Sequence, residues 1–192
     1  MYRNLKKYRV YLGKARANLG LQGWKVAEKA QMCPELYSEV ENGSAGDHIT
    51  FITICKIAIA LDLSLEYVFE QEIKYQVRTF KKPYNVVGEY RPRWVSWRVP
   101  KSFYNYRMYL YEVRASLHYS IEQVSETIGI ARSHYYAVES GRFTDAIAFN
   151  VMYRIFKTLH LDFKEATKKE LEYLNERANG KYSNLLKNFN SE

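Results

Sequence analysis

The sequence predicts a mainly α-helical protein made of two copies of one small domain. Shifting the chain along itself by 98 positions places residues 8–69 on residues 106–167 without a gap, and 19 of the 62 aligned pairs are identical. Apolar residues recur at helical spacing in both copies. Almost all of the net charge lies in the segment between them. We therefore expect domains at 1–73 and 102–192, joined by a connector at 74–101.

Composition supports this organisation. The 192 residues accommodate two domains of about 65 residues and a connector. A content of 47% apolar residues excludes a disordered chain. Cys33 and Cys55 have no paired spacing, which favours a reducing cytoplasm, and we expect both to be buried. The first 20 residues are charged, and the longest apolar stretch, 51–61, is interrupted by Lys56, so we expect neither secretion nor a membrane span.

The first two helices of the second copy have clear signals. Leu110, Val113 and Leu117 recur at helical spacing and predict an amphipathic helix. Ser120 followed by Gln123 is typical of a capping box and predicts that a second helix begins there.

Glycines and apolar spacing define the remaining elements. Gly129 provides a tight turn, residues 131–140 form a short third helix, and Gly141 ends it. Apolar residues at 149–159 predict a fourth helix, and a fifth begins at Phe163 and continues toward Leu174. The first copy shows the same order of signals. After the start of the fifth helix of the second copy, apolar residues up to Phe189 indicate a helical extension, which we expect to pack against a partner subunit in a homodimer or against the sister domain.

This order of small, apolar and glycine positions resembles the lambda repressor and Cro type of helix-turn-helix domain, the xenobiotic-response-element family. In the first copy the match runs through residues 26–28, Met32 and residues 40–43, and then through 51–65 and Phe69. In the second copy it includes Arg114, Ser120, Val124, and residues 129–130, 132–133, 138–141 and 159. The resemblance implies five-helix domains whose third helix enters the DNA major groove while the second braces it across the backbone.

The positions that match the family's DNA-facing surface differ between the copies. In the second copy, Arg132 has the geometry to bind guanine, and Ser133 can bond a base edge or a phosphate. Further candidate DNA-binding residues of this copy are Ser120, His134, Tyr136 and Arg142, and those of the first copy are Lys25, Pro34 and Ser38. The first copy also places Glu35 and Glu39 there, which oppose phosphate. We therefore expect the second copy to be the main reader.

Two tyrosines and two glutamates shared by the copies have structural interpretations. We expect Tyr37 and Tyr135 to pack in the cores, and Glu41 and Glu139 to cap helices or form ion pairs.

The connector combines basic and aromatic residues. It carries eight bases against Glu89 alone, a net charge of +7 out of +8 for the chain. Its candidate phosphate contacts are Lys81, Lys82, Arg91, Arg93 and Arg98. Alternation at 75–79 and 94–98 predicts two short β-strands or a structured arm. Alternatively, the aromatics dock on the helical domains and the charges are solvated.

No pattern for catalysis or for a cofactor emerges. The four histidines lack metal-ligand spacing, and no catalytic triad or phosphate-binding glycine loop is present, so we expect neither an enzyme nor a metal or cofactor.

Two functional hypotheses remain. The first is a cytoplasmic regulator, of phage or mobile-element type, that binds double-stranded DNA at a pseudo-palindromic operator. The second is a protein-binding inhibitor, of anti-CRISPR or antirepressor type, that reuses helix-turn-helix domains as a protein interface.

Overall fold

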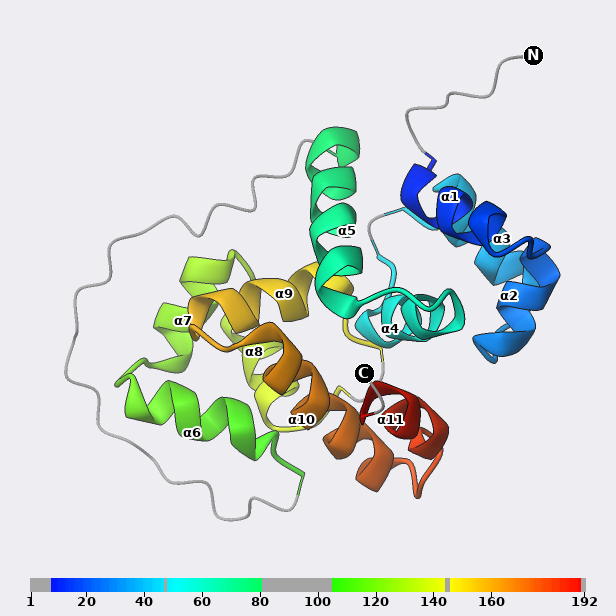
Figure 1. The fold of residues 1–192 in the computed structure, drawn as a ribbon. Coiled ribbons are helices and arrows are strands. Elements are labelled where there is room, and N and C mark those ends of the chain that lie inside the picture. Colours follow the sequence, from blue (N-terminus) through cyan, green and yellow to red (C-terminus); the bar gives the residue numbers. More distant parts are fainter. Residues whose placement is uncertain (1–7, 47, 81–104, 144–145, 191–192) are drawn as a thin grey trace. The chain divides into compact units, whose positions relative to one another are not determined.

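The computed structural model describes residues 8–46, 48–80, 105–143 and 146–190 (Figure 1). The described residues form helices and contain no β-strand longer than a single bridge. Contacts divide the chain into two compact units, one of Met1–Tyr84, Ala148–Asn150 and Lys187–Glu192, and one of Asn85–Ile147 and Val151–Leu186. The prediction of a mainly α-helical chain is confirmed.

The described N-terminal part of the first unit, residues 8–80, contains five helices: α1 (Val10–Asn18), α2 (Gly23–Lys29), α3 (Pro34–Asn42), α4 (Phe51–Ala60) and α5 (Leu65–Phe80). Helix α3 begins with Pro34 at its first position, where no backbone donor is lost, and ends at Gly43, whose φ is +81°. Helix α2 packs on α3 and α4, and α4 packs on α5. Helix α4 is buried along most of its length and is the centre of this core.

In the second part of the chain the helices are α6 (Met108–Ser116), α7 (Ile121–Ile128), α8 (Arg132–Glu139), α9 (Phe149–Thr158), α10 (Phe163–Arg177) and α11 (Ser183–Asn190). Each predicted helix of the second copy is present within one or two residues of its expected bounds. The predicted extension consists of the end of α10 and the short helix α11. None of the described helices combines the length and the apolar character that a bilayer span requires.

The predicted β-strand at 75–79 is wrong, because these residues lie in α5. Val68, Phe69, Glu72, Tyr75 and Gln76 are buried, and their spacing is that of one helix face. A five-residue window of alternating residues is too short to separate a strand from the end of a long helix. The predicted end of the first domain at residue 73 also lies inside this helix. The second predicted strand, at 94–98, lies outside the described residues.

A buried arginine organises each unit. In the first unit, the guanidinium of Arg9 donates to both carboxylate oxygens of Glu72, at 2.7 and 2.9 Å, and to the carbonyl of Val40 at 2.7 Å. The hydroxyl of Tyr11 donates to the same carboxylate at 2.8 Å, and the ring of Tyr75 lies 4.3 Å from the guanidinium. Both charged side chains are fully buried. Helices α3 and α5 are thereby joined to the start of α1.

The same arrangement recurs 98 positions later. Arg107 donates to Glu170 at 2.8 and 3.0 Å and to the carbonyl of Val138 at 2.6 Å, and Tyr109 donates to Glu170 at 2.8 Å. The ring of Tyr173 lies 4.4 Å from the guanidinium. Burial, together with the charge of Glu170, raises the pKa of Tyr109 well above its usual value. The phenol therefore remains protonated and acts as the donor.

We expect the pair Arg107–Glu170 to be essential for the stability of its unit. Glu170→Gln removes the charge and leaves the buried guanidinium without a counter-ion, which lowers the free energy of unfolding by about 3–5 kcal/mol. Urea unfolding of the full chain measures this loss. Glu172→Gln is the matched control, because Glu172 lies on the same helix but is exposed, and it changes stability by less than about 0.5 kcal/mol. Equal stability of the two variants contradicts the assignment.

Candidate nucleic-acid interface

Helices α7 and α8 pack against each other and are joined by a tight turn at Gly129. The Ser120 hydroxyl accepts from the backbone N–H of Gln123 at 3.1 Å, and the Gln123 side chain accepts from the Ser120 N–H at 2.6 Å. The predicted capping box is therefore confirmed, and it fixes where α7 begins. Gly129 ends α7 with a φ of +67°, which glycine adopts without strain. The capping box and Gly129 therefore fix where α7 begins and where it ends before α8.

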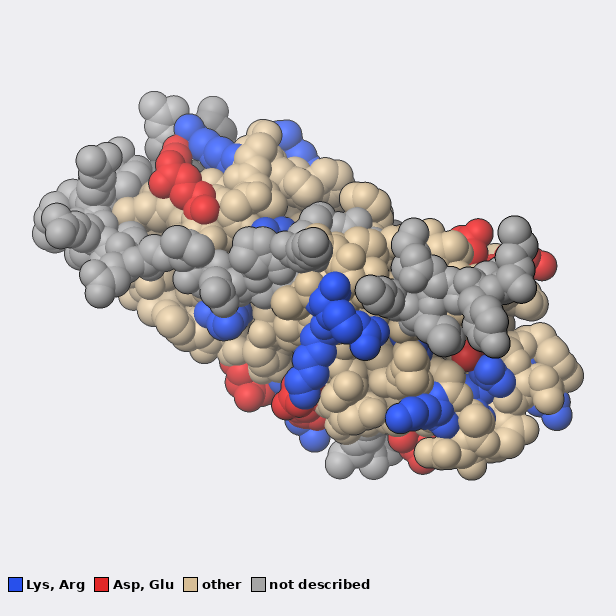
Figure 2. Space-filling view, turned by 90° about the horizontal axis from the view of Figure 1, so that it is seen from above, with Lys and Arg blue, Asp and Glu red and all other residues tan. Residues whose placement is uncertain are grey.

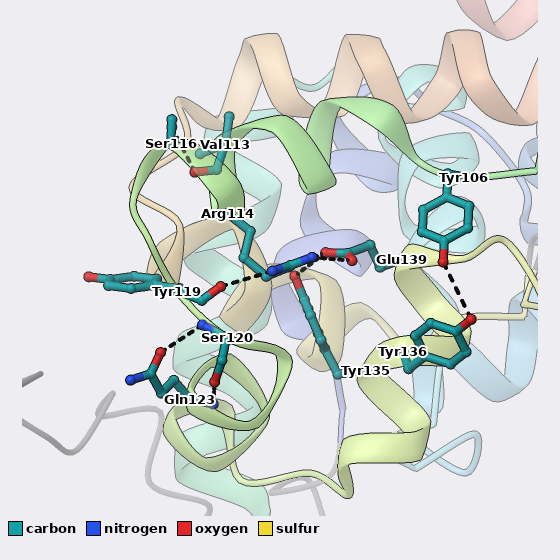
Figure 3. A network of polar contacts seen from close by, with 10 residues as sticks. All are labelled: Tyr106, Val113, Arg114, Ser116, Tyr119, Ser120, Gln123, Tyr135, Tyr136 and Glu139. Carbon is teal, nitrogen blue, oxygen red and sulfur yellow. Dashed lines mark hydrogen bonds and ion pairs between the residues drawn. The ribbon is translucent and has the colours of Figure 1, made fainter. Parts of the chain in front are cut away.

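A buried ion pair fastens α8 to α6 (Figure 3). Arg114 donates to the two carboxylate oxygens of Glu139 at 2.6 and 2.8 Å and to the carbonyl of Tyr119 at 2.8 Å, while the Tyr135 hydroxyl donates to Glu139 at 3.0 Å. Burial tends to lower the pKa of Arg114, but the hydrogen bond and charge of Glu139 outweigh it and raise the pKa. The ion-pairing interpretation of Glu139 is confirmed. Tyr135 is fully buried, as predicted.

The outer face of α8 begins with exposed polar side chains. Arg132 and Ser133 are exposed, whereas His134 and Tyr136 are half-buried. Ala131 precedes the helix and provides no side-chain cap, so the first backbone N–H groups of α8 have no partner from that residue. The Arg132 guanidinium lies 2.7 Å from the Glu122 carboxylate on α7, and both side chains are largely exposed. A surface pair of this kind contributes about 0–1 kcal/mol and exchanges readily for another anion.

The remaining second-copy candidates lie beside this face. Arg142 is exposed, and its guanidinium lies 5.2 Å from the ring of Tyr136. The Tyr136 hydroxyl accepts from Tyr106 at 3.4 Å (Figure 3). Ser120 is only 5% exposed and its hydroxyl is engaged in the capping box, so its role in the structure is to start α7. Arg132, Ser133 and Arg142 are the accessible members of the predicted set.

The corresponding surface of the first unit has different chemistry. Of its candidates, Lys25, Pro34 and Ser38 are all exposed. Glu35 and Glu39 are exposed as well, one turn apart on α3, which contains no lysine or arginine. Exposed carboxylates in a major groove repel phosphate. The exposed face of α3 is therefore acidic.

Four residues of the first unit test predictions made from the sequence: Cys33, Cys55, Glu41 and Tyr37. Cys33 is exposed, so the prediction that it is buried is wrong, whereas Cys55 is buried. Cys33 is the N-cap residue that precedes the first turn of α3, whose buried residues are Tyr37 and Val40. Glu41 pairs with Arg16 at 2.9 Å, as the ion-pair interpretation predicted, and Tyr37 is buried.

On the face shown in Figure 2, acidic side chains lie beside several of the lysine and arginine side chains. The connector candidates Lys81, Lys82, Arg91, Arg93 and Arg98 lie outside the described residues. Within the part of the chain that the structure describes, no three His, Cys, Asp or Glu side chains gather where they could hold a metal ion.

Sequence reasoning missed two features of this site. One is Glu122, which holds Arg132, because an exposed acidic residue on α7 has no distinctive signal. The other is the crowding at Gly141, whose φ is +74°. A Cβ at this position would overlap the backbone carbonyl of Asn105 and the hydroxyl of Tyr173, two groups that are hydrogen-bonded to each other at 2.9 Å. Gly141 thus ends α8 where no larger residue fits.

We expect the two glycines of this motif to respond differently to alanine. Gly141→Ala combines a left-handed φ with overlap against backbone atoms and lowers the free energy of unfolding by more than about 4 kcal/mol. Gly129→Ala has the same φ problem but open space, since its nearest neighbour is an arginine side chain at 3.7 Å, and costs about 1–2 kcal/mol. Chemical unfolding of both variants checks this order. A reversed order contradicts the described geometry.

Comparison with protein-family models matches residues 110–165 to a family described as helix-turn-helix. No curated protein and no solved structure matches the chain. The matched segment contains α7, the turn at Gly129, α8 and α9. The helix-turn-helix resemblance inferred from the sequence is confirmed for this segment. The assignment to the xenobiotic-response-element family, and the assignment of the first copy, stay predictions. Residues 110–165 form a helix-turn-helix domain of the lambda repressor and Cro type.

Proposed function

We propose that the protein is a sequence-specific regulator that binds double-stranded DNA and reads it with α8. The observation that carries the proposal is the distribution of charge on α8. Arg132 and Ser133 are exposed at its start, whereas its one carboxylate, Glu139, is 1% exposed and neutralised by Arg114. Helix α8 therefore presents donors and no exposed acid. A helix with this surface can enter the major groove without repelling the phosphates on either side.

The proposed mode of binding follows from this surface. Arg132 forks onto a guanine, which offers two acceptors in the major groove. Ser133 donates to a neighbouring base or phosphate, and the uncapped N–H groups at the start of α8 can donate to a phosphate oxygen. Glu122 holds Arg132 in the free protein and releases it when the guanine replaces the carboxylate. Helix α7 contacts the backbone across the groove.

The first unit acts as a partner domain in this proposal and not as a second reader. Its helix α3 is equivalent to α8 in the 98-residue repeat, but it exposes Glu35 and Glu39 where α8 carries Ser133 and Ala137. Carboxylates at these positions oppose phosphate, and Pro34 offers no backbone donor. The domain assignment of the first copy to the same family rests on the 98-residue repeat and on the repeated arginine network.

The connector is proposed as an electrostatic clamp, and the regulator as a phage or mobile-element protein that acts on a pseudo-palindromic operator. Support for the clamp comes from the sequence alone, where bases and aromatics alternate between residues 81 and 101. We further propose that the protein acts by binding and not by catalysis, in the cytoplasm.

A protein-binding inhibitor is the second candidate function. The observation that favours it is the exposed acidic face of α3, which suits a basic partner better than DNA. The helix-turn-helix match and the acid-free face of α8 favour the regulator. A measurement of the affinity for DNA distinguishes the regulator from the protein-binding inhibitor.

We expect Arg132→Ala to weaken binding to the preferred DNA site by about 1–3 kcal/mol and to relax selection at one base pair. Selection from random duplexes followed by fluorescence anisotropy measures both effects. Glu35→Ala is the matched change on the first unit and leaves affinity unchanged or slightly improved, because it removes a carboxylate. Unchanged affinity and unchanged site preference in Arg132→Ala would contradict the assignment of Arg132 as a base contact. A large loss of affinity in Glu35→Ala would mean that the first copy reads a cytosine.

The salt dependence of DNA binding tests the proposed role of the connector. Removing one contact to a phosphate lowers the magnitude of the slope of log affinity against log salt by about 0.9. We therefore expect the triple variant Arg91/Arg93/Arg98→Gln to bind specific and random DNA more weakly by similar factors, with a shallower slope. Titrations at several salt concentrations check this. An unchanged slope, together with loss of binding to a protein partner, favours the inhibitor.

A further inference from the structure

A small cavity lies between the start of α1 and the second half of α5, within the first unit. Its volume is about 160 Å³. Two of its lining residues come from α1 and four from α5: Val10, Tyr11, Gln71, Lys74, Tyr75 and Arg78. The four α5 residues are spaced by three and four positions, so they lie on one face of that helix. The cavity therefore brings one face of α5 together with the first turn of α1.

Three of the lining residues are apolar or aromatic. Val10 is 46% exposed, whereas Tyr11 and Tyr75 are buried. Both tyrosines are held by the buried network of this unit, because the Tyr11 hydroxyl donates to Glu72 and the Tyr75 ring lies 4.3 Å from the guanidinium of Arg9. A cavity of about 150 Å³ is large enough for a benzene molecule. The cavity beside Val10 thus has room for the apolar body of a small organic molecule.

The other part of the lining carries two positive charges. Lys74 and Arg78 are both exposed and lie one turn apart on α5. Among the residues that the structure describes, Arg78 has no hydrogen-bond or ion-pair partner. Lys74 contacts Glu70 at 3.3 Å, but the two side chains are 66% and 68% exposed, and an exposed pair of this kind is weak. Both cations can therefore pair with an anion that enters the cavity.

The second copy shows which of these residues the fold itself requires. At the equivalent positions, 98 residues later, it has the same two tyrosines but two acids in place of the cations: Tyr109, Tyr173, Glu172 and Glu176. The tyrosines serve the buried arginine network that both copies share. The two cations of α5 take no part in that network, so the network does not account for them. Carboxylates at these positions repel an anion, and attraction of an anion is thus confined to the first unit.

We propose that this cavity binds a small organic carboxylate, with its charged group between Lys74 and Arg78 and its apolar body against Val10, Tyr11 and Tyr75. A guanidinium forms two parallel hydrogen bonds with a carboxylate, and an ammonium adds a second charge-assisted contact. The amide of Gln71, on the same face of α5, offers a further donor to the ligand. The ligand contacts α1 and α5 at once. It stabilises the first unit, because it binds the folded form and not the unfolded chain.

An organic carboxylate fits the cavity better than two simpler occupants. An inorganic anion pairs with the cations but leaves the apolar part of the lining exposed to water. A neutral aromatic molecule covers the apolar part but leaves the cations unpaired. Only a ligand with both a negative group and an apolar body satisfies the whole lining. Benzoate is the simplest probe with both properties, while acetate and benzamide each lack one of them.

Titration of the isotope-labelled full chain with sodium benzoate, followed by amide NMR shifts at constant ionic strength, tests the proposal. We expect a Kd of about 1 mM or lower, with the largest shifts at Val10 and at residues 71–78. Acetate and benzamide bind at least about tenfold more weakly, because each loses one part of the contact. No saturable shift with benzoate up to about 20 mM overturns the proposal. Binding of acetate or benzamide as tightly as benzoate also overturns it.

Two variants separate the cavity from general attraction to a basic protein. Lys74→Gln/Arg78→Gln raises the Kd for benzoate by about tenfold or more. Lys25→Gln/Lys29→Gln is the matched control, because it removes two exposed cations one turn apart on α2, and it leaves the Kd unchanged. Equal Kd values for the two variants overturn the proposal. Circular dichroism verifies that both are folded.

A charge inversion provides the sharpest result. Lys74→Glu/Arg78→Glu gives the cavity the two acids of the second copy and keeps its apolar lining. This variant binds the benzylammonium ion in place of benzoate, because only the sign of the charge has changed. If it binds neither ion, the apolar lining does not form a site and the proposal is wrong. No DNA is present in these titrations, so their outcome is independent of the proposed regulator.

Discussion

Buried arginine–glutamate pairs are the constraint on which both units depend. Arg9 with Glu72, and Arg107 with Glu170, are buried pairs that link the start of the first helix of each unit to the third and fifth. A charge removed from water is tolerated only with a counter-ion and a full set of hydrogen bonds, so the partners cannot move apart. In the helix-turn-helix domain a second pair, Arg114 with Glu139, adds a link between α6 and α8. The position of α8 is set by these ionic contacts together with the apolar core.

The two units have similar buried ion pairs, but their exposed residues differ. The first-unit pair between Arg16 and Glu41 matches Arg114 and Glu139 but is partly exposed. On the outside, α3 presents carboxylates where α8 presents hydroxyl and methyl groups.

Local signals in the sequence were sufficient for most of the helices and for the turn of the candidate site. The Ser120–Gln123 capping box, Gly129 and Gly141 act through neighbouring residues, so a short stretch of sequence contains the whole interaction. The buried network depends instead on partners 63 residues apart, such as Arg107 and Glu170, and no local pattern reveals that pairing. The strand predicted at 75–79 was wrong because five alternating residues do not distinguish a strand from the end of a long helix, and the contact of Tyr75 with Arg9 is not visible in that window. The exposed residues of α8 were predicted from the family pattern, whereas the contact between Arg132 and Glu122 required coordinates.

The most direct test of which unit reads DNA is site-specific photocrosslinking. A benzophenone side chain is placed at Ser133, on the outer face of α8, and in a second preparation at the equivalent residue Glu35 on α3. Both positions are exposed, so neither substitution disturbs a core. Irradiation with a duplex selected by the full chain should attach DNA to position 133, with little attachment to position 35. Crosslinking from position 35 with none from position 133 would contradict the assignment of α8 as the reading helix.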